Sequence, residues 1–124
     1  MYSKLANLLF TLELNKHLRE EKTDAIATSA HPGYTATGLQ KNMQKGILAS
    51  FNEWAGQTPA MGALPTLYAA IAPEAQANDY IGPKGFMNMR CYPERAKPSN
   101  AARDTKTAQK LWALSEQLTG VNFK

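Results

Sequence analysis

Cysteine is nearly absent from this chain, because Cys91 is the one cysteine among 124 residues. A lone thiol excludes an internal disulfide and a zinc site built on several cysteines. The two histidines, His17 and His31, do not form a metal-binding pair either. We therefore expect no metal site.

Long hydrophobic runs are also missing. No stretch of about 18 apolar residues occurs, so we expect no transmembrane segment. The first residues lack the basic start and the continuous apolar core of a signal peptide, since Glu13, Lys16 and His17 interrupt the leucines. These absences lead us to predict a cytoplasmic protein.

The chain has no concentrated charge of either sign. Fourteen Lys and Arg and ten Asp and Glu give a net charge of +4, but the basic residues are scattered and no basic run is interleaved with aromatics. This distribution favours a solvated, mildly basic surface over a nucleic-acid partner. With 44% hydrophobic residues, the composition is that of a globular protein long enough for one domain.

The first half of the chain contains a helix pattern followed by a strand pattern. Leucines at helical spacing predict an amphipathic helix over residues 2–21, with Asn15 and Lys16 largely off its apolar stripe. Residues 25–29 predict a short parallel strand, buried on both faces, that stops at His31-Pro32-Gly33. A helix followed closely by such a strand is typical of a β-α-β unit and predicts an α/β fold.

The second half predicts two more helices and one more strand. Thr58 as N-cap and Pro59 as first helical residue start a helix that runs towards Pro73, with Pro65 inside it. Residues 80–81 suggest a strand, 85–102 a long loop, and 104–120 a last helix with an aspartate N-cap and a glycine C-cap. The expected architecture thus has two parallel strands and three main helices.

Two motifs in the first part of the chain resemble those of short-chain dehydrogenases/reductases. Ser3-Lys4-Leu5-Ala6-Asn7 is similar to the end of the family's Tyr-x-x-Ser-Lys segment with its following Leu-Ala-Asn. The second motif is His31-Pro32-Gly33-Tyr34-Thr35-Ala36-Thr37, at the carboxyl end of the expected strand, where open α/β sheets bind ligands.

Later segments point to a subgroup of that family. Gly62-Ala63-Leu64-Pro65-Thr66-Leu67-Tyr68 and Tyr80-Ile81-Gly82-Pro83 resemble the later helix and last strand of retinol dehydrogenases and protochlorophyllide reductases. The resemblance covers essentially all 124 residues and corresponds to the C-terminal portion of a full enzyme. It implies a single partial domain over residues 1–124: part of a Rossmann-like doubly wound parallel sheet whose N-terminal dinucleotide-binding half is missing.

The resemblance also implies roles for individual residues. Lys4 would be a catalytic helper that hydrogen-bonds the nicotinamide ribose, and Pro32, Gly33, Thr35 and Thr37 would line the nicotinamide site. Apolar residues in the following interval would cover a lipophilic alcohol or carbonyl substrate, or pack as an ordinary loop: Leu39, Met43, Ile47, Leu48, Phe51 and Trp54. His31 is expected to be a packed, hydrogen-bonded residue and not an acid/base group.

Two features of the resembled family have no counterpart in these 124 residues. Nothing matches its Gly-x-x-x-Gly-x-Gly cofactor turn, and its acid/base tyrosine would fall immediately before Met1. Tyr2 is roughly 200° around a helix from Lys4 and cannot take that role. We therefore expect a C-terminal fragment whose isolated chain is inactive.

Two functional interpretations stay open. The first is a fragment of an NAD- or NADP-dependent oxidoreductase that binds neither cofactor tightly by itself. The second is a non-enzymatic interaction module or pseudoenzyme that associates with an intact relative. In either case we expect a homo-oligomer, or association through the helix over residues 2–21, because unpaired strand edges and an apolar stripe invite pairing.

Overall fold

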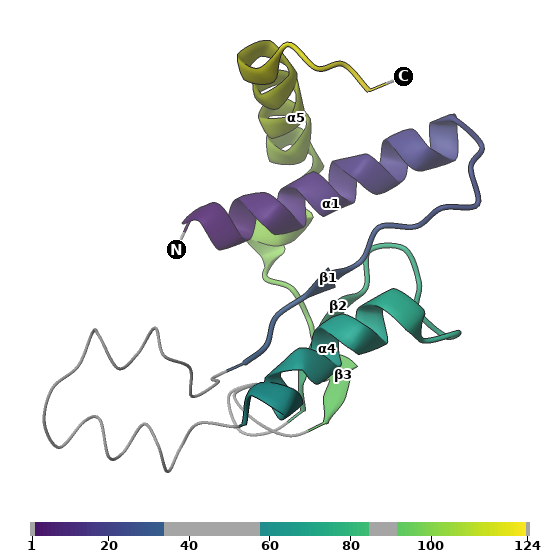
Figure 1. Ribbon diagram of the computed structural model, residues 1–124. Helices are drawn as coiled ribbons and strands as arrows, with labels where there is room; N and C mark the ends of the chain where they lie inside the picture. Colours follow the sequence, from purple (N-terminus) through teal and green to yellow (C-terminus); the bar gives the residue numbers. More distant parts are fainter. Residues whose placement is uncertain (1, 34–57, 85–91, 124) are drawn as a thin grey trace, which may run out of the picture. The chain divides into compact units, whose positions relative to one another are not determined.

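The computed structural model describes residues 2–33, 58–84 and 92–123 (Figure 1). The chain divides into two compact units. The helical unit comprises residues 1–29, 76–79 and 97–124, and the sheet unit comprises residues 30–75 and 80–96. The prediction of one partial domain over residues 1–124 stays a prediction, and each unit is described by itself below.

The helical unit starts with α1 (Tyr2–Glu20), which confirms the helix expected from the leucine spacing. Its inner face carries Leu9, which is buried. Just after the helix, Lys22 has a left-handed conformation with φ of 54°. A right-handed helix cannot continue through a residue in this conformation. There Thr23 donates its backbone N–H to the carbonyl of Leu18 at 3.1 Å, which satisfies one of the last helical carbonyls.

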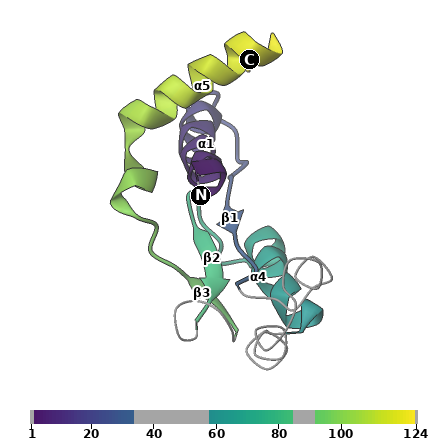
Figure 2. The ribbon, with the colours of Figure 1, turned by 90° about the vertical axis from the view of Figure 1, so that its left-hand side faces the viewer.

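The other helix of this unit, α5 (Thr105–Thr119), has both of the caps expected from the sequence. The Asp104 carboxylate accepts the backbone N–H groups of Lys106 at 3.0 Å and Thr107 at 3.3 Å. At the other end, Gly120 has φ of 69° and donates its N–H to Glu116. The short helix η2 (Asn100–Arg103) precedes α5, and both pack on α1 (Figures 1 and 2).

Aromatic rings form much of the contact between α1 and α5. Trp112 is buried and stacks on Phe10, with ring centroids 4.9 Å apart, and on His17, at 4.5 Å. Phe123 meets the edge of Trp112 at 5.8 Å. Such offset and edge contacts add to the burial of apolar area. Together with Ala108, which is fully buried, these rings make the core of the helical unit.

Asn15 of α1 is the most extensively bonded side chain of the helical unit. Its amide oxygen accepts the Ala27 backbone N–H at 2.8 Å, and its amide nitrogen donates to the Ala27 carbonyl at 2.8 Å. The nitrogen also lies 2.9 Å from both the Asn78 Oδ1 and the Thr11 carbonyl. Asn15 is 1% exposed, so the expectation that it lies off the buried face of the helix is wrong.

Three strands form a sheet in the order β1-β2-β3, and all their residues except Ser29 belong to the sheet unit. They are β1 (Ser29–Ala30), β2 (Tyr80–Pro83) and β3 (Pro93–Arg95). Ser29 donates its backbone N–H to the Asp79 carbonyl at 2.8 Å, and His31 donates to the Ile81 carbonyl at 2.9 Å. Because the residue numbers of donor and acceptor both increase by two, β1 and β2 are parallel, as expected. β2 and β3 are antiparallel, with Ile81 opposite Arg95.

Two details of the expected strands are wrong. The strand predicted over residues 25–29 begins only at Ser29, and Ile26 is 48% exposed. The Ala27 N–H bonds to the Asn15 amide oxygen, while the Ala27 carbonyl accepts the Asn15 amide and, at 3.1 Å, the backbone N–H of Asn78. The second detail is β3, which lies within the long loop predicted over residues 85–102. Pro93 weakened the strand signal there, because proline is tolerated mainly at sheet edges.

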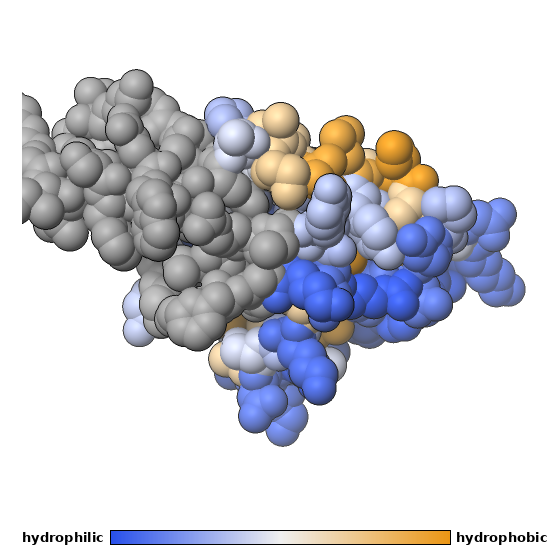
Figure 3. Space-filling model, turned by 90° about the horizontal axis from the view of Figure 1, so that it is seen from below, coloured by the Kyte–Doolittle hydropathy of each residue, from blue (hydrophilic) through white to orange (hydrophobic). Residues whose placement is uncertain are grey.

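Helix α4 (Pro59–Ile71) covers β2 and β3 within the sheet unit. It starts as expected, with the Thr58 hydroxyl accepting the Met61 N–H at 3.3 Å, and it accommodates Pro65 on its buried face. The same helix carries two exposed apolar side chains, Leu67 and Ile71. Figure 3 shows that apolar residues gather on one part of the face seen from below, beside a hydrophilic region. The helices and the mixed sheet confirm that the fold is of the α/β class and is part of a Rossmann-like fold.

No helix in the described ranges has the length and apolar character to cross a membrane.

Replacing Asn15 with alanine should lower the free energy of unfolding by roughly 1–3 kcal/mol, because the Ala27 backbone groups and the Asn78 amide lose buried partners. Urea titration followed by tryptophan fluorescence, at one protein concentration for all variants, measures the change. Asn7→Ala, at an exposed position of the same helix, is the matched control and should stay within about 0.5 kcal/mol of the parent. Equal stability of the two variants would contradict this role of Asn15.

Candidate functional site

Lys4 lies in the first turn of α1, within the helical unit, and its side chain is exposed. The helical geometry places it on a different side of α1 from Tyr2, which is 87% exposed. The lysine is therefore accessible to a ligand or partner, whereas Tyr2 is directed elsewhere. The expectation that Tyr2 does not act as an acid/base group beside Lys4 stays a prediction.

The Pro32-Gly33 turn follows β1 directly and belongs to the sheet unit. Gly33 has φ of 69°, a left-handed conformation that glycine adopts without strain. Its backbone N–H donates to Nδ1 of His31 at 3.3 Å, and this bond closes the turn. The sequence motif thus forms a tight turn at the carboxyl end of a parallel strand, where open α/β sheets bind ligands.

The remaining predicted site residues lie outside the described part of the chain. These are Thr35 and Thr37 of the cofactor segment and the six apolar residues of the substrate loop, Leu39, Met43, Ile47, Leu48, Phe51 and Trp54. Their assignments stay predictions. Lys4 and the Pro32-Gly33 turn belong to different units, so each is described within its own unit.

The His31 ring has the packed, hydrogen-bonded role expected for it. Besides accepting the Gly33 N–H, it lies against the Tyr80 ring, with centroids 5.1 Å apart and planes tilted by 33°. Burial raises the pKa of the Tyr80 hydroxyl, because removal from water disfavours the phenolate. The Tyr80 hydroxyl therefore favours its neutral form, and its ring packs beside that of His31.

The sequence did not indicate which residues of β2 support this turn. Tyr80 and Gly82 alternate with Ile81 along the strand, and the ring of His31 meets both of them. The sequence did predict a strand at residues 80–81, and this prediction was the one indication that β2 could support the turn. The register that brings these two residues under His31 follows from the hydrogen bond of His31 to the Ile81 carbonyl.

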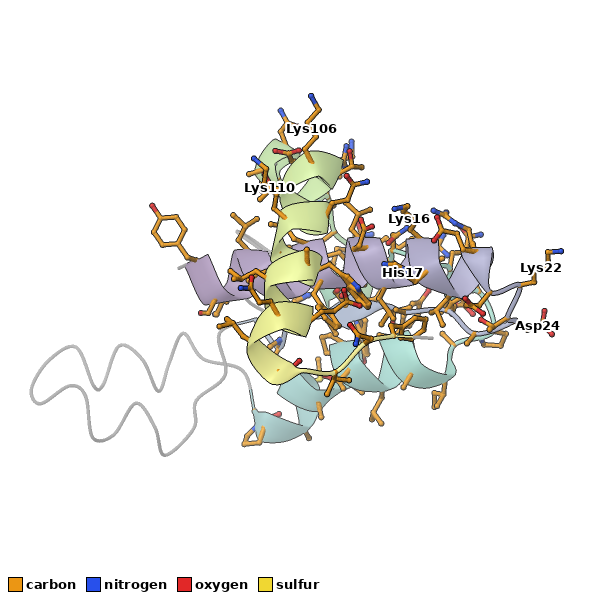
Figure 4. The ribbon with its side chains drawn as sticks, turned by 90° about the horizontal axis from the view of Figure 1, so that it is seen from above. Lys16, His17, Lys22, Asp24, Lys106 and Lys110 are labelled. Atoms are coloured by element: carbon orange, nitrogen blue, oxygen red, sulfur yellow. The ribbon has the colours of Figure 1, made fainter. Side chains whose placement is uncertain are left out.

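Glu13 and Lys16 of α1 form an ion pair at the edge of the buried face. Glu13 is 3% exposed and accepts a hydrogen bond from the Lys16 ammonium at 2.9 Å. That hydrogen bond raises the pKa of Lys16. In Figure 4, Lys106 and Lys110 extend outward from α5, while Lys22 and Asp24 lie in the loop after α1. This spread of charge agrees with the solvated surface expected from the sequence.

An apolar groove of about 560 Å³ also lies in the helical unit. Aromatic rings of the core and the last described residues line it, with Glu116 among the few polar groups: Phe10, Trp112, Ser115, Glu116, Thr119, Val121, Asn122 and Phe123. The Glu116 carboxylate accepts the Phe123 backbone N–H at 3.4 Å, which holds the chain end against α5. The groove brings together no acid/base or nucleophilic set.

Metal chemistry has no candidate in the described ranges, where no three His, Cys, Asp or Glu side chains are grouped to hold an ion. The described candidate residues are therefore an exposed lysine at the start of a helix in the helical unit and, separately, a glycine turn at the end of a parallel strand in the sheet unit.

Nearly the whole chain is similar in sequence to known dehydrogenases. No family profile matches the chain. The chain is 36% identical over 124 residues to retinol dehydrogenase 14 of Mus musculus, and the match covers 96% of this chain and 34% of that protein. It is 35% identical over 118 residues to the chloroplastic short-chain dehydrogenase TIC 32 A of Brassica napus, covering 94% of this chain and 35% of that protein.

A solved structure gives the same relationship in three dimensions. The crystal structure of an uncharacterized protein from Mycobacterium paratuberculosis superposes with a TM-score of 0.72 at 36% sequence identity. The match covers 98% of this chain and 38% of that protein. The chain thus spans about a third of the length of these relatives.

Replacing Gly33 with alanine should destabilise the protein by roughly 1–2 kcal/mol, because an L-residue with a Cβ is strained in the left-handed conformation. Gly33→Asn is the matched control, since asparagine tolerates this conformation better, and it should cost less. Urea titration of both variants measures the difference. A Gly33→Ala variant as stable as the parent would show that the turn does not need its left-handed residue.

Proposed function

We propose that the chain is the C-terminal portion of an NAD- or NADP-dependent oxidoreductase of the short-chain dehydrogenase/reductase family, in the subgroup that includes retinol dehydrogenases. Its substrates in the complete enzyme are alcohols or carbonyls, lipophilic ones in particular. The 124 residues supply one wall of the nicotinamide site and one catalytic helper. The polypeptide by itself is inactive.

One observation carries this proposal: the Pro32-Gly33 turn stands directly at the carboxyl end of a parallel strand. Gly33 has no Cβ and a left-handed conformation, so the backbone of the turn can approach a flat ligand closely. These properties suit the nicotinamide end of the cofactor. Thr35 and Thr37, which follow in the same motif, would add polar groups that hydrogen-bond the carboxamide or a phosphate.

Lys4 has a different task in the proposed enzyme. Its ammonium would hydrogen-bond the ribose of the nicotinamide nucleotide, and its charge would favour the ionised form of a neighbouring tyrosine. The exposure of Lys4 at the start of α1 supports this, since the group is accessible to such partners. The cofactor, when bound, supplies the hydride acceptor or donor.

The sequence after the turn supports a lipophilic substrate. Six apolar side chains between residues 39 and 54 would cover the substrate and exclude water from the reacting atoms. The mouse relative's name refers to retinol, an apolar alcohol, which agrees with that composition. We propose a cytoplasmic location on the sequence grounds given above, although one relative is named as chloroplastic.

A non-enzymatic interaction module is the second candidate. It is favoured by apolar side chains that α1 exposes, since Tyr2 is 87% and Phe10 42% exposed. Two strands, β1 and β3, also form the edges of the sheet. These surfaces suit association with another copy of the chain or with an intact relative.

Titration of the purified chain with NADH and NADPH, followed by nicotinamide fluorescence, tests the proposed inactivity. We expect no micromolar binding of either cofactor, because these residues contain no glycine-rich turn to hold the pyrophosphate. Turnover of lipophilic alcohols should also be undetectable, since a missing general acid/base typically costs a factor of about 10²–10⁴. Micromolar binding of either nucleotide would overturn the proposal that these residues form only part of the cofactor site.

Sedimentation velocity tests the proposed self-association. We expect the isolated chain to sediment as a species larger than one chain, and Tyr2→Ser should shift the equilibrium towards monomer if α1 makes the contact. Leu67→Ser is the matched control, because Leu67 is 52% exposed on α4 and lies neither on α1 nor on an edge strand. A strictly monomeric chain that unfolds cooperatively would contradict this expectation.

A further inference from the structure

The ring of His31 lies directly over Gly82 of β2, in the sheet unit. A Cβ built on Gly82 would lie 2.6 Å from the ring Cδ2 and 2.8 Å from Cε1, and it would overlap Nε2. Real Cβ atoms do not approach other heavy atoms closer than 3.0 Å. Any side chain larger than hydrogen at position 82 therefore displaces the ring.

The backbone conformation does not by itself call for glycine at this position. Within the described ranges, the glycines with positive φ are Gly33 and Gly120, so Gly82 has a conformation open to other residues. Position 82 is buried and pairs with Glu94 of β3 in the ordinary antiparallel register. The lack of a side chain at Gly82 thus serves to make room for the ring.

The same ring is hydrogen-bonded to the turn. Nδ1 of His31 accepts the Gly33 N–H at 3.3 Å, while the His31 backbone N–H donates to Ile81 at 2.9 Å. The ring is therefore held from three directions: by the strand beneath it, by the Tyr80 ring beside it, and by the turn that it closes. Moving the ring off Gly82 would withdraw Nδ1 from the Gly33 amide.

We infer that His31 and Gly82 form a positioning pair that fixes the Pro32-Gly33 turn, with Gly82 acting through the histidine ring. Neither residue is a catalytic group in this assignment. The effect of this pair on nicotinamide binding rests on the proposed function, in which the turn lines the cofactor site. A turn fixed before the cofactor binds lowers the ordering cost of binding.

Amide hydrogen exchange at Gly33, read by mass spectrometry with single-residue fragmentation, tests the pair in the complete 124-residue chain without cofactor. His31→Ala removes the acceptor, so exchange at Gly33 should become roughly three to ten times faster. His31→Ser keeps an oxygen that can accept the N–H two residues later, and exchange should stay near that of the parent. Gly82→Ala should accelerate exchange as much as His31→Ala, although the histidine is still present.

The double variant Gly82→Ala with His31→Ser is the decisive rescue. Serine lacks the ring atoms that meet the added Cβ, so slow exchange at Gly33 should return, and folding should return if Gly82→Ala alone does not fold. Gly120→Ala is the control for general destabilisation, because Gly120 has φ of 69° and open space around it. It should leave the Gly33 amide unchanged.

Two results would overturn the assignment. One is parent-like exchange at Gly33 in Gly82→Ala, and the other is a double variant that exchanges as fast as Gly82→Ala or stays unfolded with it. The measurement is made without nucleotide, so it is independent of the proposed function. If the oxidoreductase proposal is wrong, the exchange rates expected here still hold, because no nucleotide takes part in the measurement. If the positioning pair is wrong, the exchange rates differ from those expected, and the resemblance to the relatives is unaffected.

Discussion

The bonds between the Asn15 side chain and the Ala27 backbone are the interaction on which the packing of the helical unit depends. One buried amide accepts the Ala27 N–H and donates to its carbonyl, and so holds the segment after α1 against the helix it has just left. Two backbone bonds continue this contact within the helical unit, because the Ala27 carbonyl also accepts the Asn78 N–H and Ser29 donates its N–H to Asp79. Within the sheet unit, His31 donates its backbone N–H to the Ile81 carbonyl, next to the Pro32-Gly33 turn.

Local signals in the sequence predicted the elements whose ends they encode. Helix α5 was predicted at both ends because its aspartate N-cap and glycine C-cap act within one turn of the chain. Asn15 was misplaced because its burial depends on Ala27 and Asn78, which are distant in sequence, and a polar residue on a helix is ordinarily exposed. β3 was missed for a related reason, since three residues with a proline carry almost no periodic signal.

The candidate site also has a part that local sequence signals predicted and a part that depends on contacts between distant residues. The position of the Pro32-Gly33 turn could be predicted, because a glycine motif after a strand is a local feature and its resemblance to a family is readable. Its support could not be predicted, because the packing of the His31 ring on Gly82 requires the register of two strands separated by the whole of α4. A turn supported by buried contacts is a preorganised surface, which is the property that a cofactor site needs.

The central claim is that these 124 residues can serve as the nicotinamide-site wall of a short-chain dehydrogenase/reductase. The most direct test replaces the aligned segment of mouse retinol dehydrogenase 14 with this chain, keeps the relative's remaining sequence, and follows hydride transfer by nicotinamide absorbance with a lipophilic alcohol. We expect a folded chimaera that turns over, and a Lys4→Met version slowed by a factor of about 10² or more. A folded chimaera without turnover, or one indifferent to Lys4→Met, would contradict the account.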